Sequence, residues 1–227
     1  MKKLGLLLVI MVAIVSLLVI GCGGGGEEGG TTATPKATST ATPTKTSATG
    51  DTLTDLLAKG QNIGSVKYDM VVTAPGQDTM TTKVWLKGKN MKFESELEGE
   101  TSITIVNDDE QVMYLYLPDQ NMAYKMDYNN VPESAVEETE GILDYNYEIL
   151  GTETVDGKSC MVVQWTVEGM TSKMWVWKDK GFPIKVETTT SEGKSTIEYK
   201  NIQFVNISDS EFQLPAGVEI IEFPTGQ

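Results

Sequence analysis

The sequence predicts an α+β domain in which a long antiparallel sheet dominates and the helices are short. Met91, Phe93 and Leu97 alternate mainly with lysine and glutamate, which is the period-two pattern of a half-exposed strand. Turn-forming dipeptides such as Asp156-Gly157 separate runs of this kind. Strands are expected, to within a few residues at each end, at about 65–73, 79–87, 91–97, 101–107, 111–117, 121–126, 146–154, 159–168, 171–178, 184–190 and 194–205.

Two short helical segments are expected beside these strands. The first begins after Thr52, whose spacing to Asp55 suits a capping box, and Gly60 is expected to end it. The second runs from Ser134 to about Leu143 and is acidic on most sides. Because so weak a helix cannot form a core by itself, it is either a flap inserted between strands or a surface connector.

The last long strand is expected to contain a bulge near Asn201. Ile197 and Tyr199 occupy odd positions, whereas Ile202 and Phe204 occupy even ones. One regular register cannot place all four side chains on the same face of a sheet. An extra residue at this point restores the phase and bends the strand.

Residues 1–22 have the layout of an export signal. Lys2 and Lys3 precede an almost wholly apolar run, Leu4–Ile20, and Gly21-Cys22 closes it. The end of this run resembles the lipobox of prokaryotic lipoproteins, in which the cysteine thiol receives diacylglycerol. The alternative is an uncleaved membrane anchor, because the run is near the lower limit of spanning length. Both interpretations place the rest of the chain outside the cytoplasmic membrane, at the cell surface or in a periplasm.

Two further segments follow the signal. Residues 23–50 are rich in Gly, Thr, Ser and Pro and contain no large apolar side chain, so a disordered tether is expected. Residues 51–227 are long enough to form a single domain with its own core. If Cys22 is acylated, Cys160 has no partner for a disulfide, and its strand-like surroundings predict a buried, inert thiol.

Composition argues against nucleic-acid binding and against catalysis. The 227 residues carry 32 Asp and Glu against 18 Lys and Arg, a formal net charge of −14, and the cations are all lysine. Such a surface repels nucleic acid and anionic lipid headgroups. Since the chain has no histidine and no cysteine pair, neither the common nucleophile–base pairs nor a structural zinc site is expected. No enzymatic activity, cofactor or metal is predicted.

Some strands are apolar on both faces. Val112–Leu117 contains no charged side chain, so its sheet must be covered on both faces or line a cavity. The predicted domain also contains nine methionines, and methionine adapts to irregular apolar shapes. Either ordinary core filling or a deformable apolar pocket explains them.

Three segments, in order along the chain, carry a family resemblance. They are Leu56–Ser65, then Met174–Trp177 with the turn Gly181–Glu187, and finally Tyr199–Ile202 with Ser208–Val218. Together they are similar to the opening, the Trp strand with its Pro-containing turn, and the closing signature of the LolA-like superfamily. This superfamily includes periplasmic lipoprotein carriers, their outer-membrane receptors and mycobacterial glycolipid-binding lipoproteins.

The resemblance implies a fold and a binding site. The fold is an unclosed half-barrel of about 10–11 strands, with short helices over its concave face and an apolar cavity that holds acyl chains. Candidate cavity residues lie on apolar faces of successive predicted strands: Phe93, Ile103, Ile105, Met113, Leu115, Tyr124 and Trp165.

The resemblance also implies binding partners, and it narrows the functions that are expected. A lipid or acyl-chain ligand is expected, with the membrane bound through Cys22. Because some relatives regulate envelope stress, a sensor or a module that binds an envelope protein is the alternative. The soluble carriers use an arginine to hold the helical lid closed, and this chain has none. Anchored lipid binding or sensing is therefore expected rather than shuttling of lipoproteins.

Overall fold

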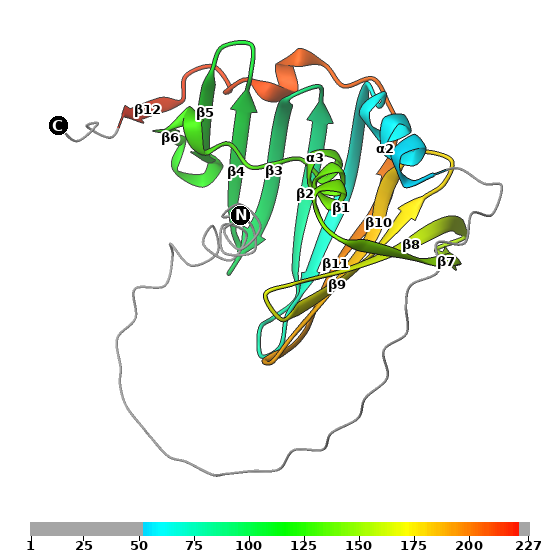
Figure 1. The fold of residues 1–227 in the computed structure, drawn as a ribbon. Helices are drawn as coiled ribbons and strands as arrows, with labels where there is room; N and C mark the ends of the chain where they lie inside the picture. Colours follow the sequence, from blue (N-terminus) through cyan, green and yellow to red (C-terminus); the bar gives the residue numbers. More distant parts are fainter. Residues whose placement is uncertain (1–51, 223–227) are drawn as a thin grey trace, which may run out of the picture. The chain divides into compact units, whose positions relative to one another are not determined.

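The computed structural model describes residues 52–222, which form one curved sheet with short helices on it (Figure 1). The export signal, Cys22 and the tether 23–50 lie outside the described residues. Within this part the strand predictions are confirmed, and the observed strands begin and end within about two residues of the expected bounds. The strands are β1 (Ser65–Thr73), β2 (Met80–Lys87), β3 (Asn90–Leu97), β4 (Glu100–Asn107), β5 (Val112–Leu117), β6 (Met122–Met126), β7 (Tyr147–Val155), β8 (Lys158–Val167), β9 (Met170–Trp177), β10 (Phe182–Thr190), β11 (Gly193–Gln203) and β12 (Glu219–Glu222).

The described sheet is built from two meanders that meet at β1. Its order is β12-β6-β5-β4-β3-β2-β1-β11-β10-β9-β8-β7. Neighbouring strands are antiparallel, except that β12 lies parallel to β6. The sheet is not closed, since β12 and β7 form its two edges. The predicted α+β half-barrel is confirmed, with β12 as an additional strand.

Two capped helices cover one face of this sheet (Figure 1). The helix α2 (Leu53–Gln61) has Thr52 and Asp55 in a reciprocal capping box, as predicted. The helix α3 (Ala135–Glu140) has the same motif at Ser134 and Glu137. The remaining helices of residues 52–222 are one-turn 3-10 segments: η1 (Pro118–Gln120), η2 (Tyr128–Asn130), η3 (Gly141–Asp144) and η4 (Asp209–Phe212).

The segment from α3 to η3 is a covering element rather than a surface connector. Ala135 and Thr139 of α3 are buried, and Ile142 of η3 is 1% exposed within the core beneath α2. Before it, residues 127–134 cross from the end of β6 to α3 (Figure 1). The Tyr128 hydroxyl bonds to the Asp108 carboxylate and ties this crossing segment to the β4–β5 turn.

Gly60 does not end α2, contrary to the prediction. The helix continues to Gln61, and Asn62 is its C-cap. A Cβ atom on Gly60 would lie 2.5 Å from the carbonyl oxygen of Gly181. Gly181 itself has a φ of 66°, and a Cβ atom there would overlap the Leu56 carbonyl. Both glycines are explained by the close approach of α2 to the β9–β10 turn.

The predicted bulge is confirmed in β11. Lys67 pairs with Gln203 but Asp69 pairs with Lys200, so β11 contains one extra residue between these pairs. Asn201 lies there with a φ of 51°, and its amide donates to the Asp69 carboxylate at 2.5 Å. Asparagine tolerates this left-handed conformation better than most residues.

The opposite face is covered by the C-terminal segment. After β11 the chain places Ile207 and Phe212 against Ile105 in a buried cluster. Asp209 and Glu211 of η4 form ion pairs with Lys87 (2.6 Å) and Lys92 (3.0 Å). The segment thus covers the opposite face of the sheet at β4.

Candidate functional site

The register of the sheet fixes which side chains point toward the helices. Met161 and Val163 on β8, and Met174 and Val176 on β9, share a core cluster with Leu56 of α2. Directly paired residues share a face of a sheet, and so do residues two apart on one strand. These two rules assign the residues of each strand either to this side, called the helix face, or to the opposite face.

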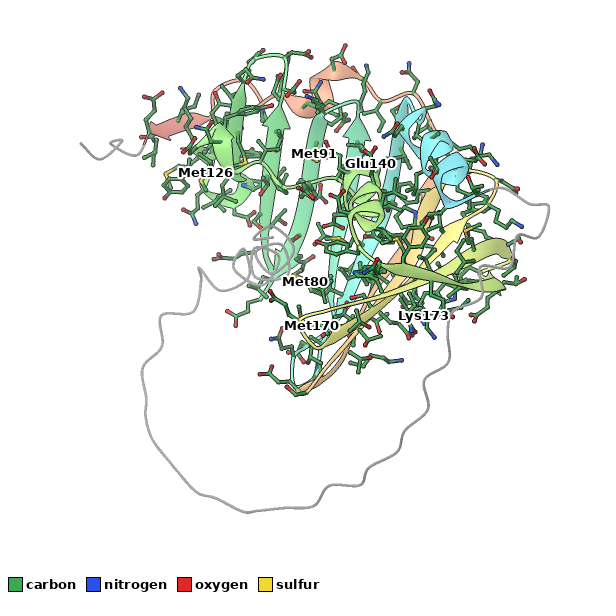
Figure 2. All side chains as sticks on the ribbon, in the orientation of Figure 1. Met80, Met91, Met126, Glu140, Met170 and Lys173 are labelled. Carbon is green, nitrogen blue, oxygen red and sulfur yellow. The ribbon has the colours of Figure 1, made fainter. Side chains whose placement is uncertain are left out.

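All nine methionines of the described domain occupy helix-face positions. Random placement would put about half of them on each face. Figure 2 labels four of them, which are spread from β6 to the start of β9. The nine are Met70, Met80, Met91, Met113, Met122, Met126, Met161, Met170 and Met174.

The helix face has a covered region and an open region. In the covered region, on β8, β9 and β10, side chains such as Met174 (4% exposed) are buried beneath α2 and η3. In the open region, on β3, β5 and β6, six large apolar side chains are only partly buried, and Met126 is 37% exposed, whereas Met91 and Met113 on the same strands are buried. The open region consists of Phe93, Leu115, Leu117, Met122, Tyr124 and Met126.

Five of the seven predicted cavity residues lie on the helix face, four of them on β3, β5 and β6 and the fifth on β8. Phe93, Met113, Leu115 and Tyr124 lie on the helix face of β3, β5 and β6. Trp165 lies on the helix face of β8, 7% exposed and within the core under α2. In the described part of the chain its indole nitrogen is a buried polar group without a hydrogen-bond partner.

Ile103 and Ile105 are separated from the other five. They alternate with Thr104 and Val106 on β4, and this parity directs them to the opposite face. Ile105 is 3% exposed beneath Ile207 and Phe212. The seven residues therefore do not line one common cavity, and ligand binding by the other five stays a prediction.

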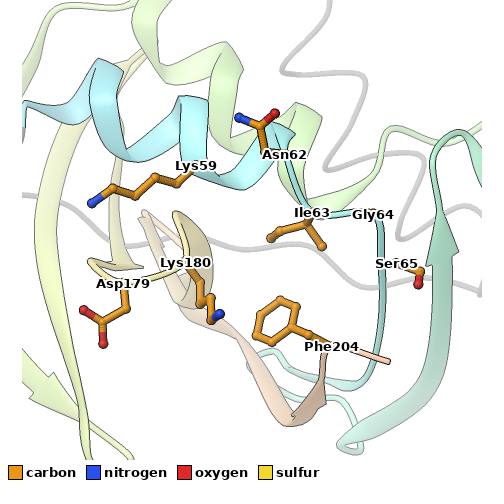
Figure 3. Close-up of a pocket in the computed structure, with 8 residues that line it drawn as sticks. All are labelled: Lys59, Asn62, Ile63, Gly64, Ser65, Asp179, Lys180 and Phe204. Carbon is orange, nitrogen blue, oxygen red and sulfur yellow. The ribbon is translucent and has the colours of Figure 1, made fainter. Parts of the chain in front are cut away.

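Sequence reasoning missed a cavity of about 430 Å³ at the C-terminal end of α2 (Figure 3). The Lys180 ammonium lies 5.2 Å from the Phe204 ring centroid, and Lys59 donates to the Lys178 carbonyl at 3.2 Å. None of the seven predicted residues lines this cavity. The lining residues are Lys59, Asn62, Ile63, Gly64, Ser65, Asp179, Lys180 and Phe204.

A partly buried acid, Glu138, lies where α3 meets the helix face. Its pKa is raised to about 7, mainly by loss of solvation and also by the nearby carboxylates of Glu133 and Glu137. Glu138 faces Tyr68 and Tyr199, whose pKa values are raised mainly by burial and also by Glu138. These two rings pack edge-on at 5.5 Å. α3 thus places an acid rather than a cation against the sheet.

The described residues offer little for covalent or metal chemistry. Cys160 is a free thiol, fully buried, and burial raises its pKa to about 11, which suits the inert role expected for it. Between residues 52 and 222, no three His, Cys, Asp or Glu side chains gather where they could hold a metal ion. The helices of this part are all too short or too polar to span a membrane.

Comparison with known families assigns the chain. Residues 64–180 match the family described as "Domain of unknown function (DUF4412)". The chain belongs to this family. This DUF4412 chain is also similar to "Uncharacterized protein MJ0687" of Methanocaldococcus jannaschii, at 26% identity over 179 residues. That alignment covers 68% of this chain and 50% of the relative, so the chain spans about half of the relative's length.

Solved structures share the fold at low identity. An uncharacterized conserved protein from Thermus thermophilus superposes with a TM-score of 0.55 and 10% identity, covering 75% of this chain and 98% of that one. The MucB of the Pseudomonas aeruginosa MucA/MucB complex gives 0.50 and 12%, covering 74% and 63%. At this identity the similarity concerns the fold alone, and the LolA-like fold implied by the resemblance is confirmed.

Proposed function

We propose that this chain is an extracytoplasmic lipoprotein, anchored through Cys22, that binds a lipid or other hydrophobic ligand on its helix face. The placement of all nine described methionines on that face carries the proposal. Methionine is flexible and polarizable, so it can adapt to apolar ligands of variable shape. Apolar clusters also occur on the opposite face, around Trp175 and Ile105, yet no described methionine lies on that face.

The open region supports a ligand on this face. Leu115 and Leu117 on β5 pair directly with Tyr124 and Met122 on β6, and all four side chains are partly exposed. Contiguous apolar surface of this kind commonly marks a binding site.

The proposed role is binding and not catalysis. The chain has no histidine, and its described thiol is buried with a raised pKa, so the usual activated nucleophiles are lacking. A net charge of −14 disfavours nucleic acid as a partner. The proposed partners are therefore an acyl-chain ligand and the membrane that holds the anchor.

Light-dependent cross-linking tests this proposal in cells. A photoactivatable, clickable fatty acid would be supplied to cells that express the full chain, and cross-linked peptides would be mapped by mass spectrometry. We expect light-dependent cross-links on β3, β5 and β6. Acylation at Cys22 would appear without light, and Cys22→Ser would abolish it. If Cys22→Ser retains the acyl label, the lipobox interpretation is wrong.

A pair of adjacent substitutions on β5 provides the matched control. Leu115 lies on the helix face and Tyr114 on the opposite face, and both are partly buried. Leu115→Asp places a charge in the open region and should reduce cross-linking about tenfold. Tyr114→Asp should leave cross-linking near the wild-type level, provided that both variants melt cooperatively. Equal losses in the two variants would contradict a helix-face site.

A protein-interaction module or envelope sensor with the same fold is the second candidate. The MucB structure that shares this fold contains MucA(peri). In this chain, exposed apolar side chains gather on the edge strand β7, where a protein segment can pair. If the acyl probe gives no light-dependent cross-links in folded protein, this second function is favoured.

A further inference from the structure

Exposed apolar side chains concentrate at one edge of the sheet. Eight large apolar residues are exposed in the described part of the chain, and half of them lie between residues 143 and 150. Leu143 is 38% exposed, Tyr147 38%, Ile149 47% and Leu150 43%. This density exceeds the scattered single exposures that are normal for a soluble surface.

These residues flank an open backbone edge. β7 is the last strand of the sheet, and among the described residues it pairs with β8 alone. Every β7 residue before Val155 is exposed. Alternate N–H and C=O groups of such an edge point away from the sheet and can pair with another strand. The bulge between Ile149 and Gly151 interrupts the register on the β8 side.

The two edges of the sheet differ in ways that matter for docking. β12 has four residues and lies parallel to β6, whereas β7 has nine residues in an antiparallel pair. Short edge strands are one of the devices that proteins use against unwanted pairing, and lysine or proline on the edge is another. β7 is long and contains neither lysine nor proline.

Charge indicates what would pair with this edge. Residues 143–155 contain Asp144, Glu148 and Glu153 and no lysine. Antiparallel pairing of two copies of β7 would bring like charges together, which is unfavourable. We propose that β7 is a docking edge for an extended segment of a partner protein that alternates apolar and basic side chains. The apolar residues would pack on Tyr147 and Ile149, and the basic ones would face the carboxylates.

This proposal does not depend on lipid binding, because it uses the backbone edge rather than the open region. A suitable probe is a peptide of four Lys-Val repeats, acetylated and amidated, titrated into the full chain in detergent micelles. We expect a dissociation constant in the micromolar range and slowed hydrogen exchange at the amides of residues 147–155. The same peptide with alternate amides N-methylated should not bind, because it keeps its charge but loses its pairing edge.

Charge reversal provides the matched variants. Glu153 already accepts a hydrogen bond from the Trp175 indole at 2.7 Å, so the test variant is Asp144→Lys with Glu148→Lys. Peptide affinity should fall about tenfold, and a Glu-Val peptide should gain affinity. The control variant is Glu110→Lys with Asp119→Lys, which replaces two exposed acids at distant turns. It should change the affinity of neither peptide.

Three outcomes would overturn the proposal. Equal binding of the N-methylated peptide would show that only charge is recognised. Protection that maps to the helix face would place the peptide in the proposed lipid site instead. Protection of residues 147–155 without peptide, rising with protein concentration, would show that a second copy of this chain occupies the edge.

Discussion

The covered and open regions of the helix face have the same kind of sequence but different environments. In the covered region, Met161 and Met174 are 7% and 4% exposed, beneath Leu56 of α2. In the open region, Met126 is 37% exposed and Met122 is partly exposed. All of them come from apolar positions of alternating strands. The strand pattern therefore does not decide between core and surface, which depends on the element packed above the strand.

Because of this difference, the two regions are expected to contribute to different properties, the covered region to stability and the open region to ligand binding. A residue under α2 contributes its apolar area to folding, whereas a residue in the open region keeps part of that area available for a ligand. The boundary between the regions lies near α3, whose contact with the sheet includes the partly buried carboxyl of Glu138. If this division is right, substitutions in the covered region should act on stability and substitutions in the open region on binding.

Removing a large side chain from α2 should have the largest effect. Leu56 is 0% exposed and contacts the covered region, so Leu56→Ala should lower the free energy of unfolding by roughly 2–5 kcal/mol. Leu117→Ala removes the same atoms from the partly exposed open region and should lower it by about 1 kcal/mol. Urea denaturation measures both. Equal losses would show that the open region is as well packed as the covered one.

Glu138 should make the domain less stable as pH rises. Its pKa is about 7 in the folded state against 4.5 when unfolded, so between these values the folded state binds the extra proton. The free energy of unfolding should therefore fall from pH 5 to pH 8, by about 2–3 kcal/mol, and be constant above. Glu138→Gln should remove most of this decrease and raise the melting temperature at pH 8. An unchanged pH profile in Glu138→Gln would contradict burial of this carboxyl.

The β11 bulge tests the junction between the two meanders. Asn201 lies at a φ of 51° and donates to Asp69. Asn201→Ala should reduce the free energy of unfolding by about 1–2 kcal/mol, because alanine tolerates this conformation poorly and cannot make the bond. Asn201→Gly, which keeps the conformation and loses only the bond, should reduce it by less than about 1 kcal/mol. Thermal unfolding distinguishes the two, and a larger loss for glycine would contradict the conformational explanation.

Local patterns predicted the strands and caps well because each is a short-range effect. Alternation around Phe93 and capping-box spacing at Thr52 act within a few residues. The bulge at Asn201 was also predictable, since the phase change is visible within one strand. Long-range pairings were not: β12 is only four residues long and pairs with β6 across the domain, and its sequence carries too little alternation to indicate a strand.

The site was less predictable because it depends on packing between distant segments. No pattern within β4 states whether Ile105 or Val106 faces the helices, since that depends on the register of neighbouring strands. Gly60 resembled a helix stop, but its role comes from Gly181, which is far away in the sequence. The cavity near Lys59 joins the end of α2, the β9–β10 turn and the end of β11, and no motif links these segments.

Replacing methionine with leucine should have the smallest effect on stability and should show what the methionines do. Met122→Leu with Met126→Leu keeps volume and apolarity in the open region, so the free energy of unfolding should change by less than about 0.5 kcal/mol. Leucine is branched and stiffer, so it adapts less well to ligands of different shape. Light-dependent cross-linking should therefore become more selective among acyl probes of different chain length, with some probes losing severalfold. Met161→Leu with Met174→Leu, in the covered region, is the control and should leave the probe preference unchanged. If both pairs alter the preference equally, the ligand reaches beneath α2 and the division between the two regions is wrong.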